Sequence, residues 1–278
     1  MTEMNDSRIE SPEGGRLING VAGNAGDELS YQLYLPATLR PSRPVLTAVH
    51  GISRNPLDWL NLFKPSADTH GVALFTPLFD EARFGDFQRL GRHGRGQRAD
   101  HALIRVLDKL SDEHGMRPSM ALFGFSGGAQ FAHRFAMVHS SRVSSLVLGA
   151  AGWYTWPDSS TGFPYGTRPI SALPGVNFDP EKLLSIPIRV IVGRDDTIRD
   201  QTLNTRARID KTQGRTRRDR AENWVRAMHT LALARNLPAR VDLQFLDGTG
   251  HSVLDGGSDR MLRSLTCNWF FDSNNNSL

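Results

Sequence analysis

Short apolar segments that alternate with helical segments constrain the fold of this chain more than any other feature. Each apolar segment is continuous, whereas a strand with one face in water would alternate apolar and polar residues. Continuous segments of this length are typical of strands in a sheet that helices cover on both faces. We predict strands at Tyr31–Pro36, Val45–His50, Val72–Phe79, Met120–Phe125, Ser145–Ala150, Ile188–Val192 and Val241–Leu246.

The segments between and after these strands have helical character. Ala99–His114 repeats its apolar residues with a helical period and ends before Gly115, a residue type that commonly caps helix C-termini. Further helices are predicted at Gly127–His139, Ala221–Asn236 and Ser258–Phe271. Strands that alternate with helices predict an α/β fold, in which a mostly parallel sheet is connected by right-handed crossovers.

Length and composition favour one soluble globular domain. The 278 residues are 39% hydrophobic, contain one cysteine (Cys267), and show no internal repeat. No apolar run reaches the roughly 18 residues of a membrane-spanning helix, and the first residues lack the basic start and apolar stretch of a secretory signal. We expect a cytoplasmic protein with a single domain over residues 16–272, and frayed ends at residues 1–15 and 273–278.

The charge pattern is weakly basic and rich in arginine. Lys and Arg number 33 and Asp and Glu 29, which gives a net charge of +4. Residues 83–98 and 199–220 are Arg-rich, and either solvated loops or recognition of a substrate carboxylate would explain them. The cluster Arg215–Arg220 is expected to open a helix and to pair with acidic residues. We expect no nucleic-acid partner, since phosphate-loop and aromatic signals are lacking, and no metal or cofactor.

Gly124-Phe125-Ser126-Gly127-Gly128 is the strongest candidate for chemistry. This G-x-S-x-G pattern follows a predicted strand and opens a predicted helix, the context in which it forms a nucleophile elbow. Glycines without Cβ atoms let strand and helix approach closely, so the serine is exposed on a sharp turn. Its hydroxyl would then project at the carboxyl edge of the sheet, where open α/β folds bind ligands.

A serine nucleophile needs a base, and the base needs an acidic partner. His251 lies on a glycine-flanked loop directly after the last predicted strand, where it could reach Ser126. Asp195 and Asp196 follow another predicted strand, and either could orient the imidazole. The chain order Ser, acid, His is the order expected on this kind of sheet.

Two backbone amides are candidates for stabilising a negatively charged oxygen. The Gly127 N–H belongs to the first turn of a predicted helix, where amides have no partner within the helix. The pair His50-Gly51 follows a predicted strand, and its tight turn would expose the N–H of Ile52 toward the same site. Removing one such donor typically slows acyl transfer by roughly 100- to 1,000-fold.

Taken together, these motifs resemble the α/β-hydrolase superfamily over roughly residues 30–272. The resemblance rests on four motifs: His50-Gly51, the elbow, the acid loop Gly193-Arg194-Asp195-Asp196, and the loop around His251. GFSGGAQFAHRFA and AAGWYTWP look most like the esterase and polyhydroxyalkanoate-depolymerase-like branch. The resemblance implies an eight-stranded sheet with helices on both faces, and it favours Asp196 over Asp195 as the acid.

The resulting functional hypothesis is a serine hydrolase that cleaves a small-molecule carboxylic ester through Ser126, His251 and Asp196. The same three residues could instead serve thioester, peptide or acyl-transfer chemistry, or the fold could be retained by a non-catalytic binding protein. An aromatic, cap-like segment at residues 152–185 contains Trp153, Tyr154 and Trp156. These three side chains either line a substrate pocket or plug the top of the sheet.

Overall fold

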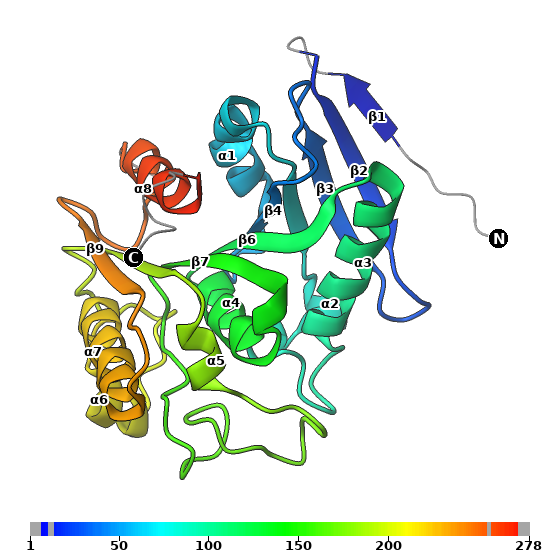
Figure 1. The fold of residues 1–278 in the computed structure, drawn as a ribbon. Helices are drawn as coiled ribbons and strands as arrows, with labels where there is room; N and C mark the ends of the chain where they lie inside the picture. The colour runs from blue at the N-terminus through cyan, green and yellow to red at the C-terminus, as the bar shows by residue number, and fades with distance from the viewer. Residues whose placement is uncertain (1–6, 11–13, 255–256, 272–278) are drawn as a thin grey trace.

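A computed structural model describes residues 7–10, 14–254 and 257–271, and these residues form one nine-stranded sheet (Figure 1). The order across the sheet is β1-β2-β3-β5-β4-β6-β7-β8-β9. The strands are β1 (Ser7–Glu10), β2 (Arg16–Ala22), β3 (Leu29–Leu35), β4 (Pro44–Val49), β5 (Leu74–Leu78), β6 (Arg117–Phe125), β7 (Val143–Gly149), β8 (Ile188–Gly193) and β9 (Val241–Leu246).

The sheet is parallel from β5 to β9 and antiparallel at the other end. The pairs β5–β4, β4–β6, β6–β7, β7–β8 and β8–β9 are all parallel. The pairs β1–β2, β2–β3 and β3–β5 are antiparallel. Because β4, β6, β8 and β9 run in one direction, the loops that follow them emerge at the same edge of the sheet.

Helices cover both faces of the sheet. The helices α1 and α8 pack together on one face, and α3, α4 and α7 lie on the other (Figure 1). The α-helices are α1 (Pro56–His70), α2 (Glu81–Phe84), α3 (Ala99–His114), α4 (Gly127–Val138), α5 (Pro180–Leu184), α6 (Ala207–Gln213), α7 (Arg217–Arg235) and α8 (Asp259–Phe271). Two short 3₁₀ helices are η1 (Phe87–Arg89) and η2 (Ser140–Arg142).

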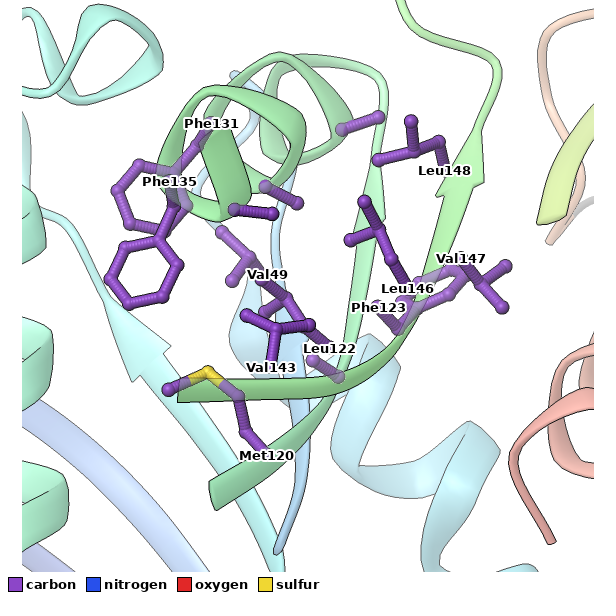
Figure 2. Packing of buried hydrophobic residues seen from close by; sticks show 14 of the residues in the cluster. Val49, Met120, Leu122, Phe123, Phe131, Phe135, Val143, Leu146, Val147 and Leu148 are labelled. Carbon is purple, nitrogen blue, oxygen red and sulfur yellow. The ribbon is translucent and has the colours of Figure 1, made fainter. Parts of the chain in front are cut away.

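Neighbouring residues of the central strands pack against opposite helical layers, which explains why these strands are continuously apolar. Phe131 and Phe135 of α4 lie over one side of the central strands (Figure 2). Phe123 of β6 instead contacts α1, with its ring centroid 5.0 Å from that of Trp59 and 4.9 Å from that of Phe63. Both faces therefore bury apolar surface, at roughly 25 cal/mol per Å² removed from water.

All seven predicted strands and all four predicted helices are present, with small differences at their ends. The resemblance predicts eight strands, whereas the described residues form nine. The strand β2 was not predicted because its half-exposed sequence is neither continuously apolar nor regularly alternating. The strand β1 lies in the segment 1–15, which was expected to fray, and it pairs with β2. Residues 273–278, the other end that was expected to fray, lie outside the described part of the chain.

Helix α1 was also missed from the sequence. It starts with Pro56 in its first turn, where a missing N–H costs nothing, but it also carries Pro65 in its interior. The Arg-rich segment 199–220 contains α6 and the start of α7, so the expectation that Arg215–Arg220 opens a helix is confirmed. Among the described helices, none combines the length and the hydropathy that crossing a membrane requires.

Two buried histidines should make the fold sensitive to acid. Burial lowers the pKa of His50 to about 4 and holds the pKa of His133 well below its ordinary value. Because the unfolded chain binds these protons more readily, the free energy of unfolding should fall as the pH drops from about 6.5 to about 4. The His50 contribution is about 3 kcal/mol, measurable by urea unfolding across this pH range.

His50→Gln provides the control for this acid sensitivity. The variant removes one titrating group, so its free energy of unfolding should depend less steeply on pH than that of the parent. Equal pH dependence in the two proteins would show that His50 does not contribute.

Candidate active site

Ser126 lies on a strained turn between β6 and α4. Its backbone has φ 52° and ψ −110°, in the left-handed region that non-glycine residues rarely occupy, and its N–H donates to Gly149 O at 2.8 Å. A Cβ on Gly128 would lie 2.2 Å from Val49 O, and one on Gly124 would lie 2.3 Å from Gly128 O. The glycines are therefore required by close backbone contact, as predicted for a nucleophile elbow.

The loop between β4 and α1 lies against this elbow. A Cβ on Gly51 would lie 3.6 Å from Ser126 Cβ, and one on Gly127 would lie 3.2 Å from Ile52 N. Within the described residues, the N–H groups of Ile52 and Gly127 have no hydrogen-bond partner. The structure thus brings the two predicted oxyanion donors together beside Ser126, with both amides available to a ligand.

His50 ties this loop to the end of β5. Its Nδ1–H donates to Gly51 O at 2.7 Å, and its Nε2 accepts from Phe79 N–H at 2.9 Å. The ring must be neutral to accept at Nε2, which agrees with the lowering of its pKa by burial. His50 is therefore a structural support for the Gly51–Ile52 turn.

His251 contacts Asp196, not Asp195. The distance from His251 Nδ1 to Asp196 Oδ2 is 3.0 Å, and Asp196 is only 1% exposed. Asp195 is exposed, and its backbone N–H donates to Thr249 O, which fixes the turn. The His251 ring stacks on Phe125, the residue before Ser126, with a centroid separation of 5.5 Å. Of the two acids that the sequence left open, Asp196 is the one that contacts the imidazole, and Asp195 belongs to the turn.

Ser126 and His251 line one open cavity of about 510 Å³ at the carboxyl edge of the sheet. Its walls combine apolar side chains with hydroxyl groups and one carboxylate. They are formed by Gly51, Ile52, Ser53, Asp58, Trp59, Phe125, Ser126, Thr202, His251, Ser252, Val253 and Leu254. Two further hollows, of about 710 and 590 Å³, lie against α7, and of the predicted site residues only Trp156 lines one of them, the smaller.

Several wall residues were not predicted from the sequence. Asp58 and Trp59 belong to α1, and Thr202 belongs to the Arg-rich segment after β8. Asp58 could have been predicted only if α1 had been recognised. Asp58 lies in the first turn of this helix, and it lines the cavity together with Gly51. Thr202 carries no sequence signal of its own.

A buried arginine connects the acid to the cavity wall. Arg217, 1% exposed, contacts Asp196 Oδ1 at 3.4 Å and donates to both carboxylate oxygens of Asp200, at 2.8 and 3.1 Å. It also donates to Thr202 Oγ1 at 2.7 Å. Hydrogen bonding to Arg217 holds the pKa of Asp200 well below its ordinary value. Arg217 thus joins the helix α7 to the loop that carries Asp196.

Most arginines of the two Arg-rich segments pair with acidic residues of the chain itself. Arg220, fully buried, and Arg199 both bind Asp210 at 2.8 Å. In the other segment, Arg89 and Arg92 both bind Asp86. The pairing with acidic residues that is expected for Arg215–Arg220 is confirmed for Arg217, Arg218 and Arg220. No arginine is among the described residues that line the Ser126 cavity.

The aromatic residues of segment 152–185 lie away from this cavity. Tyr154 is buried and stacks on Trp224 with a centroid separation of 4.8 Å, and Trp153 is buried under Arg134. Trp156 is half-buried and lines the hollow beside α7. Their positions do not support a substrate pocket made of these three residues, and they fit the alternative that the aromatics plug the sheet. The described residues hold no cluster of three potential metal ligands.

Comparison with known proteins supports the fold. No protein-family model matches the sequence, and no curated protein matches it. The poly(3-hydroxybutyrate) depolymerase LpqC from Bordetella parapertussis superposes with a TM-score of 0.77 and 24% identity, over 96% of this chain and 90% of that one. Poly(aspartic acid) hydrolase-1 from Sphingomonas sp. KT-1 gives 0.75 and 23%, over 95% and 98%.

A third solved structure, an S-formylglutathione hydrolase from Agrobacterium tumefaciens, is more distant. It has a TM-score of 0.61 and 14% identity, and the superposition covers 97% of this chain and 100% of that one. The strand order, the turn at Ser126 and these similarities all indicate the same fold. The chain has the α/β-hydrolase fold, as the sequence predicts.

Arg217→Met should destabilise the protein strongly. The change leaves the buried carboxylate of Asp196 without its neighbouring cation, and breaking a buried pair typically costs about 3 kcal/mol or more. Arg218→Met is the matched control, because Arg218 is half-exposed and its ion pair with Glu222 should contribute less than about 1 kcal/mol. Urea unfolding measures both free energies. Equal losses in the two variants would contradict the role assigned to Arg217.

Proposed function

We propose that this chain is a serine hydrolase that cleaves carboxylic esters. The observation that carries the proposal is the 3.0 Å contact between His251 and buried Asp196, over a cavity that Ser126 lines from a strained turn. Further support comes from the similar structures, two of which are named as hydrolases and one as a depolymerase. These likenesses concern the fold, so the assignment to esters depends on the site.

In the first half of the reaction, Ser126 Oγ attacks the ester carbonyl while His251 Nε2 accepts its proton. Asp196 keeps Nδ1 protonated, so that Nε2 is the basic nitrogen, and it stabilises the imidazolium that forms. The N–H groups of Ile52 and Gly127 bind the negatively charged oxygen of the tetrahedral intermediate. The intermediate collapses to an acyl-enzyme, and His251 returns the proton to the departing alcohol.

Water completes the cycle by the same path. His251 Nε2 removes a proton from a water molecule, whose oxygen attacks the acyl carbon and forms a second tetrahedral intermediate. Collapse of this intermediate releases the carboxylic acid, and the proton returns to Ser126 Oγ. The open cavity admits both ester and water without a large lid, and no step calls for a metal or an organic cofactor.

Ser126→Ala should abolish covalent labelling by a fluorophosphonate probe and hydrolysis of simple esters. The change removes the nucleophile but no buried contact, so the thermal unfolding midpoint should stay nearly unchanged. Gel fluorescence and a melting curve measure the two effects. Retained labelling in this variant would assign the nucleophile to another residue.

Asp196→Asn should lower kcat for ester hydrolysis by roughly 10,000-fold, because the amide favours the wrong imidazole tautomer. Asp195→Asn is the matched control, and its exposed side chain predicts a change of less than about threefold. Steady-state kinetics on one ester compare both variants. A larger loss in Asp195→Asn would reverse the assignment.

A further inference from the structure

A side-chain amide lies beside the nucleophile elbow and has no role in the scheme above. Gln88 is the central residue of η1, in the Arg-rich segment 83–98. Its Nε2 lies 2.9 Å from the position that a Cβ on Gly127 would take, and Ile52 N lies 3.2 Å from the same position. The Gln88 amide, Gly127 and the Ile52 N–H therefore border one small volume next to Ser126.

This amide is available for a ligand. The Gln88 side chain is half-buried, and within the part of the chain that the structure describes it has no hydrogen-bond partner. A half-buried amide without a partner in the protein can donate to a bound molecule that supplies an acceptor. Its neighbours, the N–H groups of Ile52 and Gly127, likewise have no partner among the described residues.

A buried arginine holds the main chain at Gln88. Arg134 is fully buried, and its Nη1 donates to Gln88 O at 2.7 Å. The same guanidinium donates from Nε to Thr155 Oγ1 at 2.9 Å, and it lies 4.5 Å from the centroid of the Trp153 ring. Arg134 therefore has few alternative positions, and a fixed carbonyl at Gln88 limits where its side chain can go.

The turn around Gln88 is closed by a second set of contacts. Asp86 accepts hydrogen bonds from Arg89 at 2.8 Å and from Arg92 at 2.7 Å, so one carboxylate clamps both ends of the turn. These contacts fix the main chain from which the Gln88 side chain extends. A donor on a fixed main chain needs less reorganisation when charge develops on the substrate, which favours electrostatic catalysis.

We propose that the Gln88 side-chain amide is a third donor to the oxyanion that forms when Ser126 attacks, with Arg134 as the residue that positions it. The inference depends on the proposed function, since it concerns the same intermediate. A side chain at residue 127 would require the Gln88 amide to move and would also press on Ile52. A donor role for Gln88 also gives the buried Arg134 and Trp153 a function in support of the site.

Gln88→Met tests this role, because methionine has nearly the same shape but no donor. We expect kcat for a neutral ester to fall about 100-fold, with KM changed less than about threefold, since the contact forms only as charge develops. Gln88→Glu should fall further, because a carboxylate repels the oxyanion. Gln97→Met is the matched control, with an exposed side chain on the same segment, and should behave like the parent.

All rates are expressed per active site. The number of active sites in each preparation is the amount of fluorophosphonate bound when labelling has gone to completion. This count corrects for any misfolded fraction, so a purely structural role of Gln88 would leave kcat per active site unchanged. A kcat within about twofold of the parent in Gln88→Met would overturn the proposal. A parent protein that neither binds the probe nor hydrolyses esters would instead overturn the proposed function.

Discussion

The close approach of α4 to the ends of β4 and β6 is the constraint on which the site depends. The backbone at Gly128 lies so near Val49 O that no side chain fits between them. This contact forces the chain to turn sharply at Ser126 and leaves that residue with a positive φ. The energy of this strain is offset by the packing of α4, whose Phe131 and Phe135 are buried on the sheet.

The acid side of the site depends on charges that are buried in pairs. Asp196 is shielded from water and lies between a histidine and an arginine. An isolated carboxylate in such a place would be costly, and the cation beside it reduces that cost. Arg217 and Arg220 of the Arg-rich segment that follows β8 therefore serve the interior of the protein, whereas Arg206, Arg208 and Arg215 of the same segment are exposed.

Sequence reasoning identified the central strands, four long helices, and part of the cavity wall, including Ser126 and His251. It succeeded because continuous apolar runs and glycine spacing are local properties, and because the parallel strands bring the loops after them to one edge of the sheet. It missed β2 and α1, whose patterns are weakened by half-exposed positions and an internal proline. It left open whether Trp153 and Tyr154 line a substrate pocket or plug the sheet, since composition cannot tell whether a buried aromatic faces a cavity or a neighbouring helix. Arg217 and Thr202 meet only through the tertiary fold.

The position of β9 has a consequence for how the protein responds to heat. It is the last strand of the sheet, and it pairs only with β8 among the described residues. The loop that carries His251 follows this border strand, whereas Ser126 follows a strand with neighbours on both sides. Local opening at a sheet border requires less free energy than global unfolding. Mild heating would thus open the loop that carries His251 before the centre of the sheet unfolds.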